Sequence, residues 1–187
     1  MTKPLNFTYV DNSNVFIEGS RASAVAKKLP GAETYISAMN NHVTDKTWQP
    51  DYGRLHEFVC GDKAEIGCAK LWGSPPPSDS FWKMVERKGF EVKTYEKNFA
   101  GKEKKVDVAI AHQITKDVYS GKVRKGIDEV TLVAGDKDFV PVVEDLVENG
   151  YIVHVVFWDN AAPELKAACS KFTSLNPMLE HLSRKES

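Results

Sequence analysis

Two kinds of hydrophobic pattern alternate along the chain. Short unbroken apolar runs are typical of strands that are buried on both faces of a parallel sheet. They predict strands at residues 5–10, 65–72, 90–95, 129–134 and 151–158. Between these runs, apolar positions recur every three or four residues, which indicates helices that pack by one face. This spacing predicts helices at residues 15–29, 51–60, 79–89, 106–118, 139–150, 163–170 and 178–182.

The order of these elements predicts an α/β fold. Strands that alternate with helices over the whole length form an open, mostly parallel sheet with helices on both sides. The 187 residues, 42% of them hydrophobic, suit a single domain that spans residues 1–187. Residues 32–50 show no clear period and are expected to form an excursion across the surface. The chain from residue 176 onward is expected to be a short C-terminal tail.

Charge and cysteine content narrow the class of protein. Lysine and arginine number 25 against 26 aspartate and glutamate, so a formal charge of -1 neither favours nor excludes a nucleic-acid partner. Three widely spaced cysteines argue against a disulfide framework or a thiolate zinc site. No apolar run approaches the roughly 20 residues that span a bilayer. We therefore expect a soluble, cytoplasmic protein.

Acidic side chains follow two of the predicted strands and open one helix. Asp11 ends the first strand, Asp136 follows the fourth, and Asp138 comes two residues later. Asp107 lies in the first turn of the helix that precedes the fourth strand. Ligands of open α/β sheets bind outside the carboxyl ends of the strands. We therefore expect these four carboxylates to meet at one edge of the sheet.

A divalent cation would explain such a cluster. Carboxylates that are packed together repel one another, and Mg²⁺ or Mn²⁺ prefers hard oxygen ligands. An ion of this kind polarises a phosphate and lowers the pKa of a bound water, which suits hydrolysis of phosphodiester bonds. Single acids also have structural interpretations, because Asp138 could cap a helix, Asp107 could complement a helix dipole and Asp11 could hold a turn. Capping by Asp138 would leave Asp136 unexplained.

Three segments in this order resemble the NYN domain family of PIN-like nucleases. They are Asp11-Asn12-Ser13-Asn14 after a strand, Lys105-Val106-Asp107-Val108-Ala109 at the start of a helix, and Gly135-Asp136-Lys137-Asp138-Phe139 ahead of Gly150 and an apolar strand. Their order and spacing match the family over about residues 7–175. The resemblance implies a three-layer α/β/α sandwich, Rossmann-like in its mostly parallel central sheet, and a metal-dependent ribonuclease.

The resemblance also implies roles for individual residues. The metal-binding, catalytic acids would be Asp11, Asp107, Asp136 and Asp138. Asn14 would support the first of them through a side-chain hydrogen bond or would contact the substrate. Family members often place an acidic residue in the final helix, where this chain has Ala167-Ala168-Cys169-Ser170. That contribution would be missing, or Ser170 or Asp159 would supply it.

Two clusters of basic residues flank the helix that begins near Asp107. The first comprises Lys102, Lys104 and Lys105, and the second comprises Lys122, Arg124 and Lys125. Positive charge beside an acidic site attracts a phosphate backbone, so the first cluster is predicted to contact nucleic acid. A pair of solvated loops is the alternative, and for the second cluster it is the simpler interpretation.

Two residues at the end of a strand complete the candidate nucleic-acid contacts. Trp72, like Trp158, ends a strand at the expected active edge and could stack a base. Aromatic side chains in this position more often pack in the core or at its rim. Ser74 follows Trp72 at the same edge.

These observations favour an Mg²⁺- or Mn²⁺-dependent nuclease that acts on RNA. The alternative is a catalytically weak or inactive RNA-binding or scaffolding module of the same fold, which the missing acid in the final helix favours. A third interpretation is a metal-dependent hydrolase of small phosphorylated molecules. The chain has neither a Gly-x-Gly-x-x-Gly segment nor a phosphate-binding loop signature, which argues against nucleotide cofactors. An apolar strand edge or the 32–50 excursion could serve a homodimer.

Overall fold

A computed structural model describes residues 3–74, 79–95 and 104–185 of the chain. Its centre is a six-stranded sheet with the order β3-β2-β1-β4-β5-β6, and every pairing in it is parallel. The strands are β1 (Asn6–Asp11), β2 (Ile66–Gly73), β3 (Glu91–Thr94), β4 (Glu129–Val133), β5 (Ile152–Phe157) and β6 (Lys171–Ser174). The predicted parallel α/β fold is confirmed.

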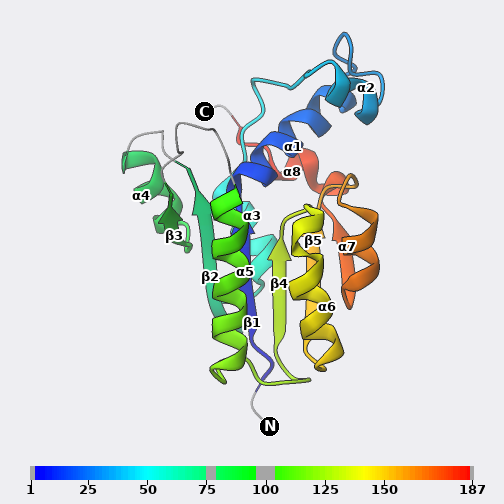
Figure 1. The fold of residues 1–187 in the computed structure, drawn as a ribbon. Helices are drawn as coiled ribbons and strands as arrows, with labels where there is room; N and C mark the ends of the chain where they lie inside the picture. The colour runs from blue at the N-terminus through cyan, green and yellow to red at the C-terminus, as the bar shows by residue number, and fades with distance from the viewer. Residues whose placement is uncertain (1–2, 75–78, 96–103, 186–187) are drawn as a thin grey trace.

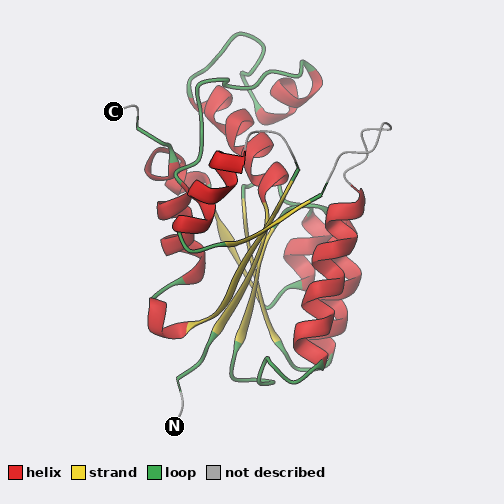
Figure 2. Ribbon diagram, turned by 90° about the vertical axis from the view of Figure 1, so that its left-hand side faces the viewer, coloured by secondary structure: helices red, strands yellow, loops and turns green. Residues whose placement is uncertain are grey.

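Helices cover both faces of this sheet, which makes the fold a three-layer sandwich (Figure 2). The helices are α1 (Asn12–Ala26), α2 (Tyr35–Asn40), α3 (Tyr52–Cys60), α4 (Asp79–Arg87), α5 (Lys104–Tyr119), α6 (Val140–Glu148), α7 (Pro163–Ala168) and α8 (Leu179–Leu182). Short 3-10 helices lie at η1 (Lys63–Glu65), η2 (Lys137–Phe139) and η3 (Asn176–Met178). None of the helices in the described ranges combines the length and apolar character needed to span a bilayer.

The alternation of side chains along β1 shows how two cores form. Phe7 and Tyr9 point into a core with α5, α6 and α7, whereas Val10 belongs to a core with α1, α3, α4 and α8. Ile110 of α5 and Leu55 of α3 are both fully buried, one in each core. Full burial of one such side chain contributes roughly 1.5–3 kcal/mol, so the apolar runs account for the layered arrangement.

The structure differs from the sequence prediction at β6 and at α2, and it confirms the short helix predicted at residues 178–182. The edge strand β6 was not predicted, because Lys171–Ser174 contains only one large apolar side chain. The 32–50 excursion contains the short helix α2, whose N-cap Thr34 accepts a hydrogen bond from the Ser37 amide. Residues 176–182 form η3 and α8, and the carbonyl of the buried Leu182 accepts a hydrogen bond of 2.7 Å from the Asp51 amide.

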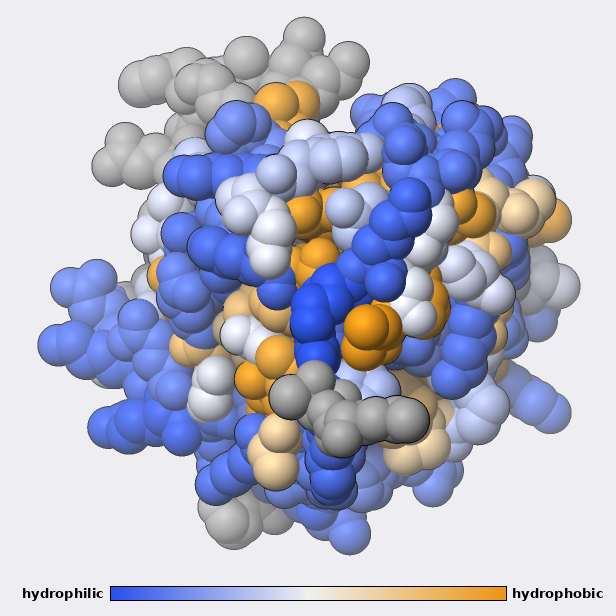
Figure 3. Space-filling model, turned by 90° about the horizontal axis from the view of Figure 1, so that it is seen from below, coloured by the Kyte–Doolittle hydropathy of each residue, from blue (hydrophilic) through white to orange (hydrophobic). Residues whose placement is uncertain are grey.

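The two ends of the sheet are different surfaces. The chain enters the sheet at the N-terminal ends of the strands, where hydrophilic residues surround smaller hydrophobic patches (Figure 3). All arrows point toward the opposite end, above which α1 and α2 lie (Figure 1). The connections from β1 and β4 leave toward opposite edges of the sheet, so these two neighbours form its switch point. Ligands of open α/β sheets bind at the carboxyl side of such a point.

Candidate metal centre

The switch point between β1 and β4 positions the first of the predicted acids. Asp11 is the last residue of β1, and Val10 before it pairs with Val133, the last residue of β4. The chain then continues through Gly135 to Asp136. A Cβ at Gly135 would lie 2.1 Å from the Phe157 ring, so only glycine lets this segment pass so close to β5.

Three carboxylates converge on this point from two elements. Asp107 from the first turn of α5 meets Asp136 and Asp138, and one oxygen of each lies within 4.8 Å of the other two. Asp11 adjoins this cluster, because its carboxylate shares a hydrogen bond with that of Asp107. The four acids that are distant in the sequence therefore meet at one edge of the sheet, as the sequence predicted.

Local hydrogen bonds fix the orientation of two of these carboxylates. Asp11 caps α1, since its Oδ1 accepts from the Asn14 backbone N–H at 3.1 Å. The Asn14 side chain also donates to Asp11 Oδ2 at 3.4 Å, which is the supporting contact expected of it. Oδ1 of Asp136 accepts from the Asp138 backbone N–H at 3.0 Å and caps η2. The cap is therefore Asp136, and the interpretation of Asp138 as the capping residue is wrong.

The cluster has an electrostatic cost that Asp107 shows most clearly. Burial raises the pKa of Asp107 to about 7, and the negative charge of Asp11 is the next largest cause. The charges of Asp136 and Asp138 act in the same direction. Among the lysine, arginine and histidine side chains that the structure describes, which do not include those of Lys104 and Lys105, none forms an ion pair with Asp107, Asp136 or Asp138. The cations in this described set therefore do not compensate the three carboxylates.

This donor set fits a hard divalent cation. Carboxylate oxygens are the ligands that Mg²⁺ and Mn²⁺ prefer, and several negative charges in one place compensate a double positive charge. Asp136 and Asp138 are also accessible to solvent, so a hydrated ion can reach them. The Mg²⁺ or Mn²⁺ expected from the sequence is consistent with the arrangement of the residues.

The predicted nucleic-acid contacts divide into three groups. Lys102 lies outside the described residues, and Lys104 and Lys105 begin α5 with side chains that are not described. Ser74 is half-buried directly after β2, at the acidic edge of the sheet. Trp72 is 1% exposed and stacks on Tyr9 in the core. Its base-stacking role is therefore wrong, because the protein's own side chains cover both faces of the ring.

The two substitutes for the missing acid of the final helix also lie elsewhere. Ser170 Oγ accepts from the amide of Val153, near the start of β5, so Ser170 lies at the opposite end of the sheet. Asp159 follows β5 at the correct end but accepts a hydrogen bond of 2.6 Å from Ser174 Oγ. Ser170 is therefore too far away to substitute, and Asp159 is not one of the three carboxylates whose oxygens lie within 4.8 Å of one another. The only acid of α7 is Glu164, in its first turn.

One polar network was missed by the sequence reasoning. Glu18 of α1 forms an ion pair with Arg21 at 2.5 Å and accepts hydrogen bonds from Tyr35 of α2 and from Asn160 Nδ2 after β5. One feature of the sequence gives a weak indication of Glu18. Glu18 follows Asn14 by four residues, which places both side chains on one face of α1.

The chain was compared with known proteins in three ways. The family model described as NYN domain matches residues 12–176, beginning one residue after Asp11. No curated protein matches the chain. Among solved structures, a protein of unknown function from Vibrio parahaemolyticus RIMD 2210633 is 16% identical, with a TM-score of 0.63 over 94% of this chain and 95% of that chain. At this level of identity, the likeness shows a shared fold and nothing more.

Proposed function

This chain belongs to the NYN domain family, and from that premise we propose that it is a divalent-metal-dependent nuclease that cleaves RNA. The observation that carries the proposal is the convergence of Asp107, Asp136 and Asp138 within 4.8 Å, beside Asp11. The helix caps formed by Asp11 and Asp136 do not require Asp107 and Asp138 beside them, and packing like charges together costs stability.

The four acids would hold the cation, Mg²⁺ or Mn²⁺. When bound, the ion supplies polarisation of the scissile phosphate and a lowered pKa for a coordinated water. The chain supplies the orientation of the ligands. Asn14 holds both oxygens of Asp11, and the Asp138 amide holds one oxygen of Asp136, so the carboxylates need little reordering when they bind.

The substrate would reach this centre past the start of α5. Lys104 and Lys105 begin the first turn of α5, which also carries Asp107, and the N-terminus of a helix carries partial positive charge. Both features attract phosphate groups. The RNA strand would therefore bind with its phosphate backbone toward α5 and the acids.

A catalytically inactive RNA-binding module is the second candidate. The observation that favours it is the last part of α7, where alanine occupies positions 167 and 168 and no acid lies beyond Glu164. Such a module would hold RNA through the same surface without cleaving it.

Incubation of the purified chain with end-labelled single-stranded RNA and Mn²⁺ tests the proposal. We expect cleavage that Asp136→Asn reduces at least about 100-fold, because loss of a metal ligand exceeds the 10- to 100-fold effect of an outer-shell partner. Glu144→Gln removes an exposed charge from the neighbouring helix α6 and should leave the rate unchanged.

Two outcomes would contradict the nuclease. Equal cleavage by wild type and Asp136→Asn would mean that another enzyme in the preparation cuts the RNA. Tight RNA binding without cleavage by any variant would support the second candidate.

A further inference from the structure

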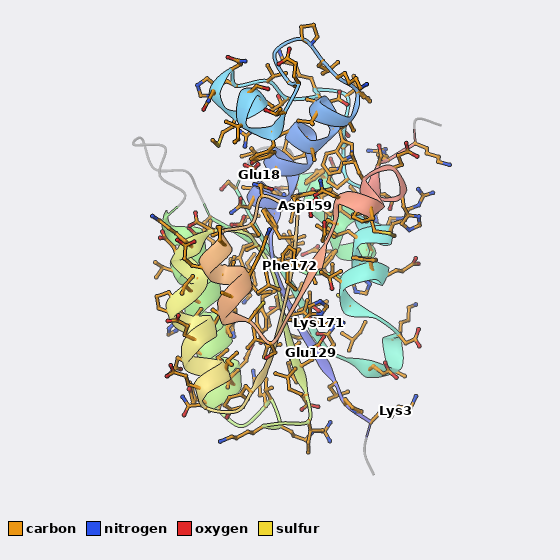
Figure 4. All side chains as sticks on the ribbon, turned by 90° about the vertical axis from the view of Figure 1, so that its right-hand side faces the viewer. Lys3, Glu18, Glu129, Asp159, Lys171 and Phe172 are labelled. Atoms are coloured by element: carbon orange, nitrogen blue, oxygen red, sulfur yellow. The ribbon has the colours of Figure 1, made fainter. Side chains whose placement is uncertain are left out.

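A pocket of about 440 Å³ lies beyond α1 from the acids, at the same end of the sheet. Residues of α1, α2, α8 and the segments that follow β5 and β6 line this pocket, which is open to solvent on one side. Its volume falls within the range of about 300–1,000 Å³ that is typical of small-ligand sites. Figure 4 shows its surroundings, with Glu18 of α1 directly above Asp159 at the C-terminal end of the sheet. No predicted metal ligand lines it.

The walls of this pocket suit a flat apolar ring. Ala22 and Val25 of α1 and Leu179 of α8 form its aliphatic sides, and Tyr35 adds aromatic surface. Trp158 borders the pocket but is only 1% exposed, so it supports the wall and offers a ligand little ring surface. Small side chains on α1 leave the space open, since a larger residue at position 22 would project into it. An aromatic ligand of one or two fused rings fits such a slot.

One end of the pocket is polar and is fixed in place. Ser174 Oγ donates to Asp159 Oδ1 at 2.6 Å, and the Asp159 amide donates to Asn176 Oδ1 at 2.8 Å. These two bonds orient both side chains. Within the described ranges, the second carboxylate oxygen of Asp159 and the side-chain N–H groups of Asn176 have no hydrogen-bond partner. The pocket therefore presents a charged acceptor next to a donor.

We propose that this pocket binds a guanine base of the RNA strand. Guanine carries two adjacent N–H donors, at N1 and N2, next to the carbonyl oxygen O6. The carboxylate of Asp159 would accept from both donors, and the Asn176 amide would donate to O6. The edges of adenine, cytosine and uracil each lack this pair of adjacent donors, so they leave the carboxylate less well matched.

The position of the pocket agrees with a base close to the cleavage site. Ala22 follows Asn14 by eight residues of one helix, so at about 1.5 Å per residue the two are roughly 12 Å apart along α1. An RNA strand with one phosphate group at the four acids can place a nearby base at this distance. The inference rests on the proposed function, because it takes the ligand to be part of the nuclease substrate.

Calorimetric titration of the full chain with guanosine monophosphate, in the presence of a chelator, tests the pocket alone. We expect guanosine monophosphate to bind at least about tenfold more tightly than adenosine monophosphate, since a matched base edge discriminates by about 1–3 kcal/mol. Ala22→Leu should fill the slot and abolish that preference. Equal affinity for the two nucleotides would overturn the inference.

A change of specificity distinguishes recognition from mere stability. Asp159→Asn replaces one acceptor by a donor, and xanthine differs from guanine by a carbonyl in place of the C2 amine. The variant should therefore lose at least about tenfold in affinity for guanosine monophosphate and gain affinity for xanthosine monophosphate. Asp62→Asn, at an exposed position before η1 where the side chain makes no capping hydrogen bond, is the matched control and should change neither. An Asp159→Asn variant that keeps the wild-type preference contradicts the proposal.

The pocket and the nuclease can fail separately. One outcome would overturn guanine binding and leave the nuclease proposal standing. In that outcome RNA cleavage depends on Asp136 but is equal at all four bases, and no nucleotide binds in the presence of the chelator. The opposite outcome is guanine-selective binding by a protein that cleaves no RNA in the presence of Mn²⁺. That result would contradict the nuclease proposal, and the guanine in the pocket would then not be part of a nuclease substrate.

Discussion

The helix α5, which runs along one face of the sheet (Figure 1), carries a half-buried acid and a buried acid with opposite electrostatic environments. Asp107 lies in its first turn, at the acidic edge of the sheet, and Asp117 lies ten residues later, about 15 Å further along the same helix. The pKa of Asp107 is raised to about 7, whereas the pKa of Asp117 is held well below its usual range. The residue type and the helix are the same, so the difference comes from the neighbours.

The neighbours of Asp117 compensate its charge completely. Burial by itself would raise its pKa, but hydrogen bonds from Lys122 and Lys70, with others from Gln113 and Tyr9, outweigh that effect. Lys70 Nζ lies 2.6 Å from one carboxylate oxygen, and Lys122 Nζ lies 2.9 Å from the other. The fold can therefore satisfy a buried carboxylate where that serves stability.

At Asp107 the same fold brings three further acids close, and their negative charges raise its pKa. The comparison teaches that the acidic edge is not a general failure to place counter-ions. It is a local arrangement that costs stability, and residues that lower stability in this way cluster at functional sites. The following predictions test whether the two ends of α5 differ as this account requires.

The largest effect on stability is expected at the compensated acid. Asp117→Asn should lower the free energy of unfolding by about 3–5 kcal/mol, because it leaves Lys70, only 9% exposed, as a buried charge without its partner. Urea denaturation at pH 7 measures the change. Asp62→Asn, at an exposed position before η1 where the side chain makes no capping hydrogen bond, should stay within about 0.5 kcal/mol of wild type.

The pH dependence checks the cause of that loss. A carboxylate whose folded pKa is depressed stabilises the protein above its unfolded pKa of about 3.9, and this stabilisation disappears as the pH falls toward the folded pKa. The gap between wild type and Asp117→Asn should therefore be full at pH 7 and narrow below about pH 4. A gap that stays constant down to pH 3 would contradict the ionic explanation.

A divalent cation should offset the loss of stability that repulsion among the acids causes near Asp107, at the N-terminal end of α5. Mn²⁺ at 100 times its dissociation constant should stabilise the folded protein by about 2.7 kcal/mol. For a domain of this size, that corresponds to an increase in Tm of about 5–10 °C by calorimetry. The increase should be absent in Asp136→Asn and unaffected in Glu144→Gln. An equal increase with K⁺ at matched ionic strength would show screening and not a metal site.

Much of the fold and the acidic edge could be predicted from the sequence, because both follow from short-range patterns. The strand of residues 129–134 is an unbroken apolar run that ends in Gly135-Asp136, and its position in a parallel sheet determines where that acid lies. Asp107 was placed in the first turn of a helix, a position that alone does not show that its side chain faces the other acids, and the resemblance added its metal-binding role. Elements with weak patterns, such as β6 and α2, were beyond this reasoning.

Contacts between distant segments explain the errors within the site. Trp72 was placed correctly at the end of a strand, but only the packing of Tyr9 from the neighbouring strand shows that its ring is covered. The residue that caps η2 depends on where the extended backbone ends. Asp136 is the last extended residue and forms the cap, instead of Asp138. Asp159 and Asn176 follow two different strands, β5 and β6, so no short sequence motif predicts their contact.

The smallest expected effect has the opposite sign to that of Asp117→Asn. Asp107→Asn removes one negative charge from the cluster and keeps the shape of the side chain. Without divalent cations, we therefore expect this substitution to raise the free energy of unfolding by about 0.5–2 kcal/mol, the usual gain when an unfavourable functional group is removed. Chemical denaturation in the presence of a chelator measures it.

The control for Asp107→Asn is the same substitution ten residues later. If like-charge repulsion and burial govern Asp107, then the two variants must move stability in opposite directions in chelator, and added Mn²⁺ must stabilise Asp117→Asn but not Asp107→Asn. A loss of stability in both variants would mean that Asp107 makes a contribution to the fold that outweighs its repulsion. The acidic edge would then be a structural feature, and the contrast along α5 would give no support to a metal centre.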